Sequence, residues 1–196
     1  MMSRKEITRA DILPFDEYAA SRRERKKALT EMKKNRRMEV GPHATFYFES
    51  YETMWNQIHE MLYIERGGEN QIPDELVAYN PLIPQGRELV ATVMFEIGDA
   101  DRRAKVLDNL GGVEETISIT VGGDKIRGVA ETDVDRTTDD GKASSVQFVH
   151  FPFTDAQADA FRQSEADVIV GFSHENYSHM AGMTGAVRAA LAKDFD

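Results

Sequence analysis

The sequence predicts an α+β fold: a helical first third, then a mostly antiparallel sheet of about five to six strands with flanking helices. Apolar residues recur at helical spacing in residues 16–38 and 50–66. Short β-branched and apolar runs separated by turn residues fill residues 89–171. Because the 196 residues contain no repeat or long linker, we expect a single domain, 1–196.

The first long helix, about residues 16–38, keeps only a thin apolar seam of Tyr18, Leu29 and Met32. One side of this helix therefore packs against the protein, and the other presents its arginines. The second helix follows Ser50, whose hydroxyl can cap its first amides, and ends near Gly67 and Gly68. Its apolar face is expected to enter the core.

The remaining elements are shorter. Strands are predicted at 45–48, 89–97, 116–121, 125–131, 144–153 and 168–171, with helices at 74–79, 99–110, 154–164 and, at the C-terminus, 185–193. Gly122 and Gly123 between two of the strands indicate a tight hairpin.

Composition narrows the class of protein. The chain has no cysteine, which excludes disulfides, iron–sulfur ligation by its own side chains and a thiol nucleophile. No apolar run approaches the ~20 residues of a membrane helix. Since the first residues also lack the apolar segment of a signal peptide, we expect a cytoplasmic protein with no membrane partner.

Charge is distributed unevenly. Residues 1–40 contain 12 Lys and Arg against 7 Asp and Glu, whereas residues 41–196 contain 12 against 27, so the two parts carry +5 and −15. The basic cluster of residues 22–37 is a candidate binding surface for phosphates or for an acidic partner. It could equally contact the acidic residues 41–196 of its own or another subunit. Its candidate residues are Arg22, Arg23, Arg25, Arg36 and Arg37. Nucleic acid is a weaker third hypothesis, because the body is acidic and no aromatics alternate with the arginines.

A second candidate site uses acids and histidines. Glu52, Asn56, His59 and Tyr63 form one polar row of the 50–66 helix that can border a cleft. Glu52 and His59 are separated by a rise of roughly 10 Å, too far for one ion, so further ligands must come from elsewhere. The candidate metal ligands are Glu52, His59, Glu60, His174, Glu175 and His179.

The second half of that set requires a particular local structure. If residues 174–180 form two helical turns, Glu175 and His179 stand one turn apart and can share a transition metal ion. The alternative is that these histidines are hydrogen-bonded side chains with no ligand. No cofactor other than a possible transition metal is indicated.

Three other motifs do not fit. Glu175 is too bulky for the strained turn of a serine hydrolase around Ser173. The acids at 133–140 lack the glycine of a calcium loop, with Thr138 in its place. The glycine pairs match neither a phosphate-binding loop nor a dinucleotide fingerprint, so no nucleotide cofactor is proposed.

Several segments together carry a family resemblance. They are FYFESYETMWNQIHEML, ELVAYNPLIP, ATVMFEI, ETDVDR, SSVQFVHFPFT and GFSHENY, and the run 79–84 is the most specific. From about Tyr18 onward the chain resembles a bacterial family of proteins of unknown function, whose genes often lie beside a rubrerythrin and an iron–sulfur or flavin-linked oxidoreductase. The resemblance implies that a loop of acids and an arginine typical of the family falls on Asp133, Asp135 and Arg136, which are further binding candidates.

The leading hypothesis is therefore a cytoplasmic accessory or binding protein that docks on a rubrerythrin-like or iron–sulfur oxidoreductase partner, in a setting of oxidative stress. The alternative is a metal-binding protein or metal-dependent enzyme with a Glu/His site. A homo-oligomer is compatible with either.

Overall fold

A computed structural model of the chain describes residues 4–131, 137, 141–163 and 165–196. Its α-helices are α1 (Phe15–Lys33), α2 (Tyr51–Glu65), α3 (Ile72–Tyr79), α4 (Ala100–Leu107), α5 (Asp155–Arg162) and α6 (Gly185–Leu191). None of the helices in the described residues is both long and apolar enough to cross a membrane.

The strands form two sheets. One has the order β1-β2-β3-β7-β6, with β1 (Arg37–Val40), β2 (Ala44–Phe48), β3 (Glu88–Phe95), β7 (Val146–Pro152) and β6 (Val129–Ala130). The other has the order β5-β4-β8-β9, with β5 (Asp124–Arg127), β4 (Ile117–Val121), β8 (Val168–Phe172) and β9 (Met180–Gly182). Each pairing of neighbours recorded in the described residues is antiparallel. The predicted α+β class is confirmed, although two sheets form where one was expected.

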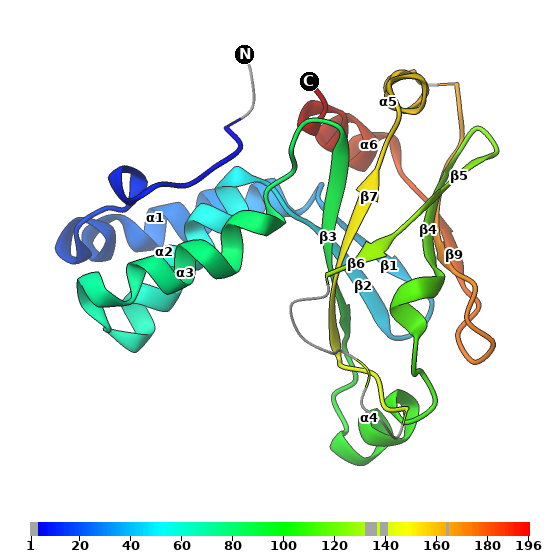
Figure 1. Cartoon of the computed structure of the whole chain (residues 1–196), viewed down its shortest axis with the longest axis horizontal. Coiled ribbons are helices and arrows are strands. Elements are labelled where there is room, and N and C mark those ends of the chain that lie inside the picture. The colour runs from blue at the N-terminus through cyan, green and yellow to red at the C-terminus, as the bar shows by residue number, and fades with distance from the viewer. Residues whose placement is uncertain (1–3, 132–136, 138–140, 164) are drawn as a thin grey trace.

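The molecule consists of a body built on the two sheets and a helical part that projects from it (Figure 1). The two sheets pack face to face, α4 lies at one end of them, and α5 and α6 lie at the other. Helices α1 to α3, together with residues 4–14, project to one side. We call this projecting part the arm.

The main core lies between the sheets. Every second residue of β3 faces this core, and the three at its inner face, Leu89, Ala91 and Val93, are fully buried. Phe46 of β2 meets Phe172 of β8 across the interface, with ring centroids 5.3 Å apart. This alternation reflects the two-residue period of a strand, which places every second side chain on one face.

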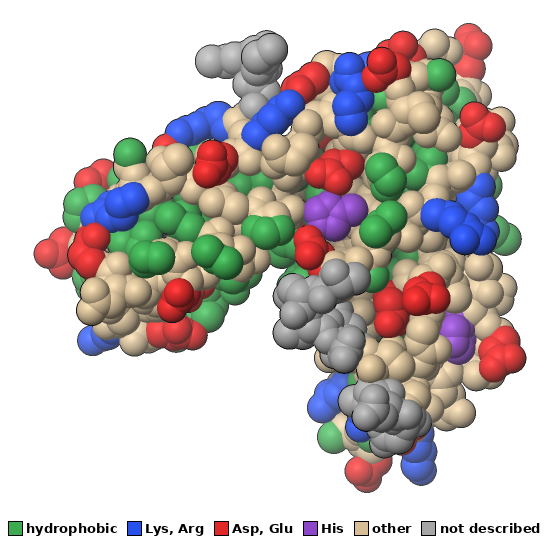
Figure 2. Space-filling model, in the orientation of Figure 1, with side chains coloured by type: hydrophobic (Ala, Val, Ile, Leu, Met, Phe, Trp, Pro, Cys, Tyr) green, Lys and Arg blue, Asp and Glu red, His purple; other side chains and the backbone are tan. Residues whose placement is uncertain are grey.

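A second apolar cluster attaches the arm. Its buried members are Ile7, Ile12, Met54, Ile58, Ile72, Leu82, Ile83 and Val90. Val90 points outward from β3, so the arm packs on the outer face of the first sheet. Not all of the apolar surface of the arm is covered: hydrophobic side chains gather over it on the face in Figure 2, and Ile64 and Val77 are exposed.

The predicted strand over residues 125–131 divides at Gly128. The part before it, β5, pairs with β4 through the expected Gly122-Gly123 turn, whereas the part after it, β6, pairs with β7 of the other sheet. A Cβ at Gly128 would lie 2.5 Å from a methyl carbon of Val149. Glycine is therefore needed where the chain crosses closely between the sheets.

The first long helix is shorter than predicted. It ends at Lys33, and residues 37 and 38, which the prediction placed at the end of this helix, belong to β1. Met38 and Val40 are buried while Arg37 and Glu39 are exposed, the period of a strand. Pairing with β2 overrides the helical propensity of this segment.

Residues 174–180 do not form the two helical turns that a metal ion shared by Glu175 and His179 would require. His174 and Tyr177 make an isolated antiparallel bridge in the connection between β8 and β9, and Met180 begins β9. The phenol of Tyr177 is buried and accepts hydrogen bonds from the backbone N–H groups of His43 and Ala44. These hydrogen bonds of Tyr177 hold the connection as a turn that leads back into the sheet, rather than as a helix.

Candidate functional site

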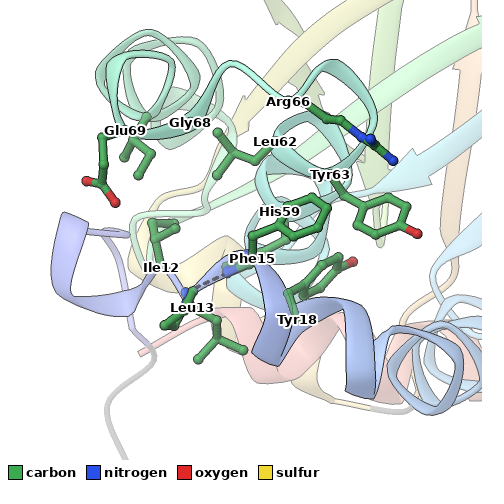
Figure 3. Close-up of a pocket in the computed structure, with 12 residues that line it drawn as sticks. Ile12, Leu13, Phe15, Tyr18, His59, Leu62, Tyr63, Arg66, Gly68 and Glu69 are labelled. Carbon is green, nitrogen blue, oxygen red and sulfur yellow. Dashed lines mark hydrogen bonds between the residues drawn. The ribbon is translucent and has the colours of Figure 1, made fainter.

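A pocket of about 440 Å³ opens in the arm, between residues 12–15 and the facing side of α2 (Figure 3). It is lined by Ile12, Leu13, Pro14, Phe15, Tyr18, His59, Leu62, Tyr63, Arg66, Gly68, Glu69 and Ile72. Its volume falls in the range of small-molecule sites in proteins, and its lining is mostly apolar with a few polar groups, as such sites usually are.

His59 lies on the inner wall of the pocket, with both ring nitrogens engaged. Its Nε2 accepts a hydrogen bond from the backbone N–H of Leu13 at 3.0 Å, drawn as the dashed line in Figure 3. Since Nε2 is the acceptor, Nδ1 carries the proton and donates it to the carbonyl of Trp55 at 2.7 Å. Burial lowers the pKa of His59, which keeps the imidazole neutral at neutral pH.

Aromatic rings form one side of the pocket. Phe15 at the start of α1 stacks on Tyr63 of α2, with centroids 5.4 Å apart and planes 7° apart. The ring centroid of Tyr18 lies 4.9 Å from that of His59, and the ring of Trp55 lies against His59 at a tilt of 32°, with centroids 3.7 Å apart. Rings with few rotatable bonds make this wall rigid.

Below these rings, Glu60 joins α1 to α2. Its carboxylate accepts two hydrogen bonds from Arg22, both at 2.8 Å, one from Lys26 at 2.9 Å and one from the hydroxyl of Tyr18 at 2.7 Å. The bonds from Arg22 are the main reason why the pKa of Glu60 falls to about 2. This network fixes α1 against α2 and so fixes the pocket wall.

The segment that closes the pocket is also anchored to the arm. Ile7 exchanges two backbone hydrogen bonds with the side-chain amide of Asn80, at 2.8 and 2.9 Å. The indole N–H of Trp55 donates to the carbonyl of Asp11 at 2.9 Å. Together with the bond from Leu13 to His59, these contacts hold residues 7–13 over α2.

The rim carries two charged residues on opposite sides, Arg66 and Glu69 (Figure 3). Glu69 accepts two hydrogen bonds from Arg9, at 2.6 and 2.8 Å. Arg66 ends α2 in the left-handed conformation, with φ 57°. Its guanidinium lies 5.9 Å from the ring centroid of Phe15 and forms no ion pair within the described ranges.

Residues 6–195 match the model of the family described as "Protein of unknown function (DUF3501)". The chain belongs to this family. It is also similar to a crystal structure of a novel protein of unknown function from Burkholderia pseudomallei K96243, with 33% sequence identity. That match covers 97% of this chain and 99% of that chain, with a TM-score of 0.89. No curated protein matches it.

Membership of a family of unknown function agrees with the resemblance seen in the sequence. The matched region includes both the arm and the two sheets, so the pocket lies within the family region. Kinship of this kind assigns no activity. The association with a rubrerythrin and with redox chemistry stays a prediction.

The candidate binding arginines are not equivalent in this family member. Arg22 is turned inward to Glu60, and Arg25 lies over the ring of Trp55 at 4.9 Å. Arg23 on α1 and Arg37 on β1 are exposed. The outer side of α1 therefore offers fewer free cations than the sequence suggests.

Arg36 is buried, contrary to the expectation that it belongs to an exposed basic helix. Its guanidinium pairs with Asp194 at 2.5 and 3.1 Å and donates to the carbonyls of Phe48 and Glu49. It links the turn after α1 to the C-terminal end of the chain. In this structure Arg36 is not accessible to a partner.

The candidate metal ligands of α2 each have other partners. Glu52 accepts a hydrogen bond from the hydroxyl of Ser50 at 2.9 Å, and Glu60 is engaged by α1. His59 has no lone pair free for a metal, because Nε2 already accepts from Leu13.

The other three candidates lie in the β8–β9 connection. The Nε2 atom of His174 lies 3.2 Å from the carbonyl oxygen of Gly111, and Glu175 is exposed. The ring of His179 packs against that of Tyr177, with centroids 4.6 Å apart. This connection and α2 lie on separate sides of the molecule (Figure 1). No cluster of three or more His, Asp or Glu side chains suited to a metal occurs among the described residues. Asp133, Asp135 and Arg136 lie outside them.

The sequence pointed to part of the pocket. His59 and Tyr63, from the polar row expected to border a cleft, do line it, whereas Glu52 and Asn56 line a separate groove beside Arg25. Arg66 and residues 12–15 were not recognised. Their role depends on how residues 4–14 fold back over α2, for which the sequence carries no local signal.

Proposed function

We propose that the chain is a binding protein that holds a small molecule with an apolar body in the arm pocket. The observation that supports this is an open, mostly apolar cavity whose walls are fixed by hydrogen bonds and ring stacking. A preformed site of this kind loses little free energy in ordering its walls when a ligand enters.

The same geometry favours binding over acid–base chemistry. A general base needs a free lone pair within reach of the substrate. Both nitrogens of His59 are engaged by backbone groups, and the hydroxyl of Tyr18 donates to Glu60. These groups therefore serve to position the walls.

The cavity volume sets the scale of the ligand. At roughly 30 Å³ per water-sized group, it accommodates about 15 non-hydrogen atoms. At roughly 0.3 kcal/mol per atom, such a fragment binds with a dissociation constant of about 1 mM. Weak binding by a simple probe is thus the expected result.

The chain contains one tryptophan, Trp55, whose ring lies against His59 of the pocket wall with centroids 3.7 Å apart. Its fluorescence provides an internal readout. Titration with 4-phenylbutan-1-ol is expected to change this fluorescence saturably and to raise the melting temperature. If neither the fluorescence nor the melting temperature changes at alcohol concentrations up to 10-fold above the expected dissociation constant of about 1 mM, the proposal is ruled out.

A pair of variants locates the binding site. Leu62→Phe adds ring volume inside the pocket, whereas Ile64→Phe adds the same ring on the exposed side of the same helix. The first variant is expected to weaken binding of the alcohol at least fivefold, and the second to leave it unchanged. Equal effects of both variants would place the probe elsewhere.

A second candidate function is docking on an acidic protein, such as a rubrerythrin-like redox partner in the cytoplasm. It is favoured by Arg23 and Lys27, which are exposed on α1 and form no ion pair in the part of the chain that the structure describes. Salt-sensitive capture of the partner at low ionic strength, lost in the Arg23→Glu/Lys27→Glu variant, is the expected result. Capture that is absent at low salt, or insensitive to these substitutions, would contradict it.

A further inference from the structure

We infer that the occupant of the arm pocket is a monocarboxylate, with its apolar body inside the pocket and its carboxylate bound by Arg66 at the rim. This inference rests on the proposed function and names the class of ligand. Four features of the lining support it.

The first feature is the charge balance. The pocket lining contains one acid, Glu69, and one arginine, Arg66. Arg9 neutralises Glu69 through two hydrogen bonds, whereas Arg66 pairs with no carboxylate of the described chain. The pocket thus carries one uncompensated positive charge, which selects an anion and disfavours a cation.

The second feature is the backbone of Arg66. Among the described residues it is the one non-glycine residue with positive φ, and its backbone N–H donates to the carbonyl of Leu62 at 3.1 Å. Glycine adopts this conformation without steric cost, and Gly67 and Gly68 follow immediately. An arginine held at a strained position on a pocket rim is the kind of outlier that accompanies ligand sites.

The third feature is the distribution of hydrogen-bond donors. In the lining, the N–H of Leu13 donates to His59 and the hydroxyl of Tyr18 donates to Glu60, whereas the hydroxyl of Tyr63 lies on the same side as Arg66 (Figure 3). A charged group placed there would lose its hydration without replacement. The anionic end of the ligand must therefore stay at the rim, where Arg66 lies, while its apolar end enters.

The fourth feature is the number of cations. One guanidinium can donate two parallel hydrogen bonds to a carboxylate. A phosphate monoester carries nearly two charges and three acceptor oxygens, and sites for it usually combine several donors. With the one free arginine of this lining, a carboxylate is matched better than a phosphate ester.

The test compares two probes of nearly equal shape, 4-phenylbutanoate and 4-phenylbutan-1-ol, by Trp55 fluorescence in the full chain. The carboxylate is expected to bind about tenfold more tightly than the alcohol. In Arg66→Gly, which also removes the backbone strain, this preference should disappear while alcohol binding is kept. Arg66→Lys should retain part of the preference, and Arg127→Gln, an equal charge change on exposed β5, should retain all of it.

The outcomes separate the two claims. Equal affinity for both probes in the natural chain, or an unchanged preference in Arg66→Gly, would overturn the carboxylate inference and leave small-molecule binding intact. A preference lost equally in Arg127→Gln would also overturn it, because it would reflect overall charge. Failure of both probes to bind the natural chain would instead contradict the proposed function itself.

Discussion

The imidazole of His59 and the backbone N–H of Leu13 form a 3.0 Å hydrogen bond that ties the N-terminal segment to α2. The bond requires the neutral ring, because protonated Nε2 is a donor and cannot accept. One side chain thus closes the pocket wall and makes that closure sensitive to acid.

Acid should therefore weaken the arm through His59. Burial lowers the pKa of His59, so the unfolded chain binds a proton more readily than the folded chain, and stability is lost as the pH falls through about 6.5. Urea unfolding at pH 7.5 and pH 5.5 should show a smaller loss of stability in His59→Phe than in the natural chain. Parallel losses in both proteins would be inconsistent with this role.

Glu60 should stabilise the contact between α1 and α2. Glu60→Gln weakens the bonds from Arg22 and Lys26, and we expect a loss of about 2 kcal/mol in the free energy of unfolding at pH 7. Because the folded pKa of Glu60 is lowered to about 2, its contribution is complete above about pH 4.5 and is lost as the pH falls toward 2.

Urea unfolding at pH 7 and pH 3 tests both parts of this prediction. The difference between the natural chain and Glu60→Gln should shrink at pH 3. Glu24→Gln, on the exposed side of α1, serves as the control and should change stability by less than about 0.5 kcal/mol. A Glu60 variant as stable as this control at pH 7 would refute the network.

His150 should titrate in the opposite direction. Its Nδ1 lies 2.9 Å from Glu88 and its Nε2 lies 2.8 Å from Glu131, and the contact with Glu88 is the larger reason that its pKa is raised. Its stabilising effect is therefore complete below about pH 6.5 and is lost as the pH rises through the folded pKa.

NMR titration of the imidazole C–H resonances measures this pKa directly. We expect His150 to titrate above 6.5, and Glu88→Gln to lower its pKa more than Glu131→Gln does. A His150 that titrates below 6.5 in the natural chain would show that the two carboxylates do not hold the charged ring.

The buried pair of Arg36 and Asp194 should be costly to break. Asp194→Ala leaves a buried guanidinium without its counter-ion, so we expect a loss of about 3 kcal/mol in urea unfolding. Glu31→Ala, which breaks an exposed pair with Lys34, should cost less than about 0.5 kcal/mol. If the Asp194 variant loses no more stability than the Glu31 variant, the pair does not fasten the C-terminal end.

The elements that could be predicted from the sequence are those with a strong local pattern. The cap at Ser50 and the stripe through Met54 and Ile58 specify α2, and the two glycines at 122 and 123 specify a hairpin. The division into two sheets could not be predicted in the same way. It depends on the crossing at Gly128, where the requirement is a close approach to Val149 from a distant part of the chain.

The site shows the same limit. His59 and Tyr63 were recognisable as a polar row, because their spacing places them on one side of a helix. Their contacts come from a distant segment of the chain: Leu13, which donates to His59, lies 46 residues before it, and Phe15 stacks on Tyr63. Arg36 was misplaced for a related reason, since its counter-ion Asp194 lies 158 residues further along.

The most direct test of the account is an NMR titration of the methyl-labelled chain with 4-phenylbutanoate. We predict saturable shifts confined to methyl groups of the arm pocket, above all Ile12, Leu13, Leu62 and Ile72. The methyl groups between the two sheets, such as Ile119 and Val170, should not move. Shifts centred on the sheets, or none at concentrations of several millimolar, would contradict a ligand site in the arm.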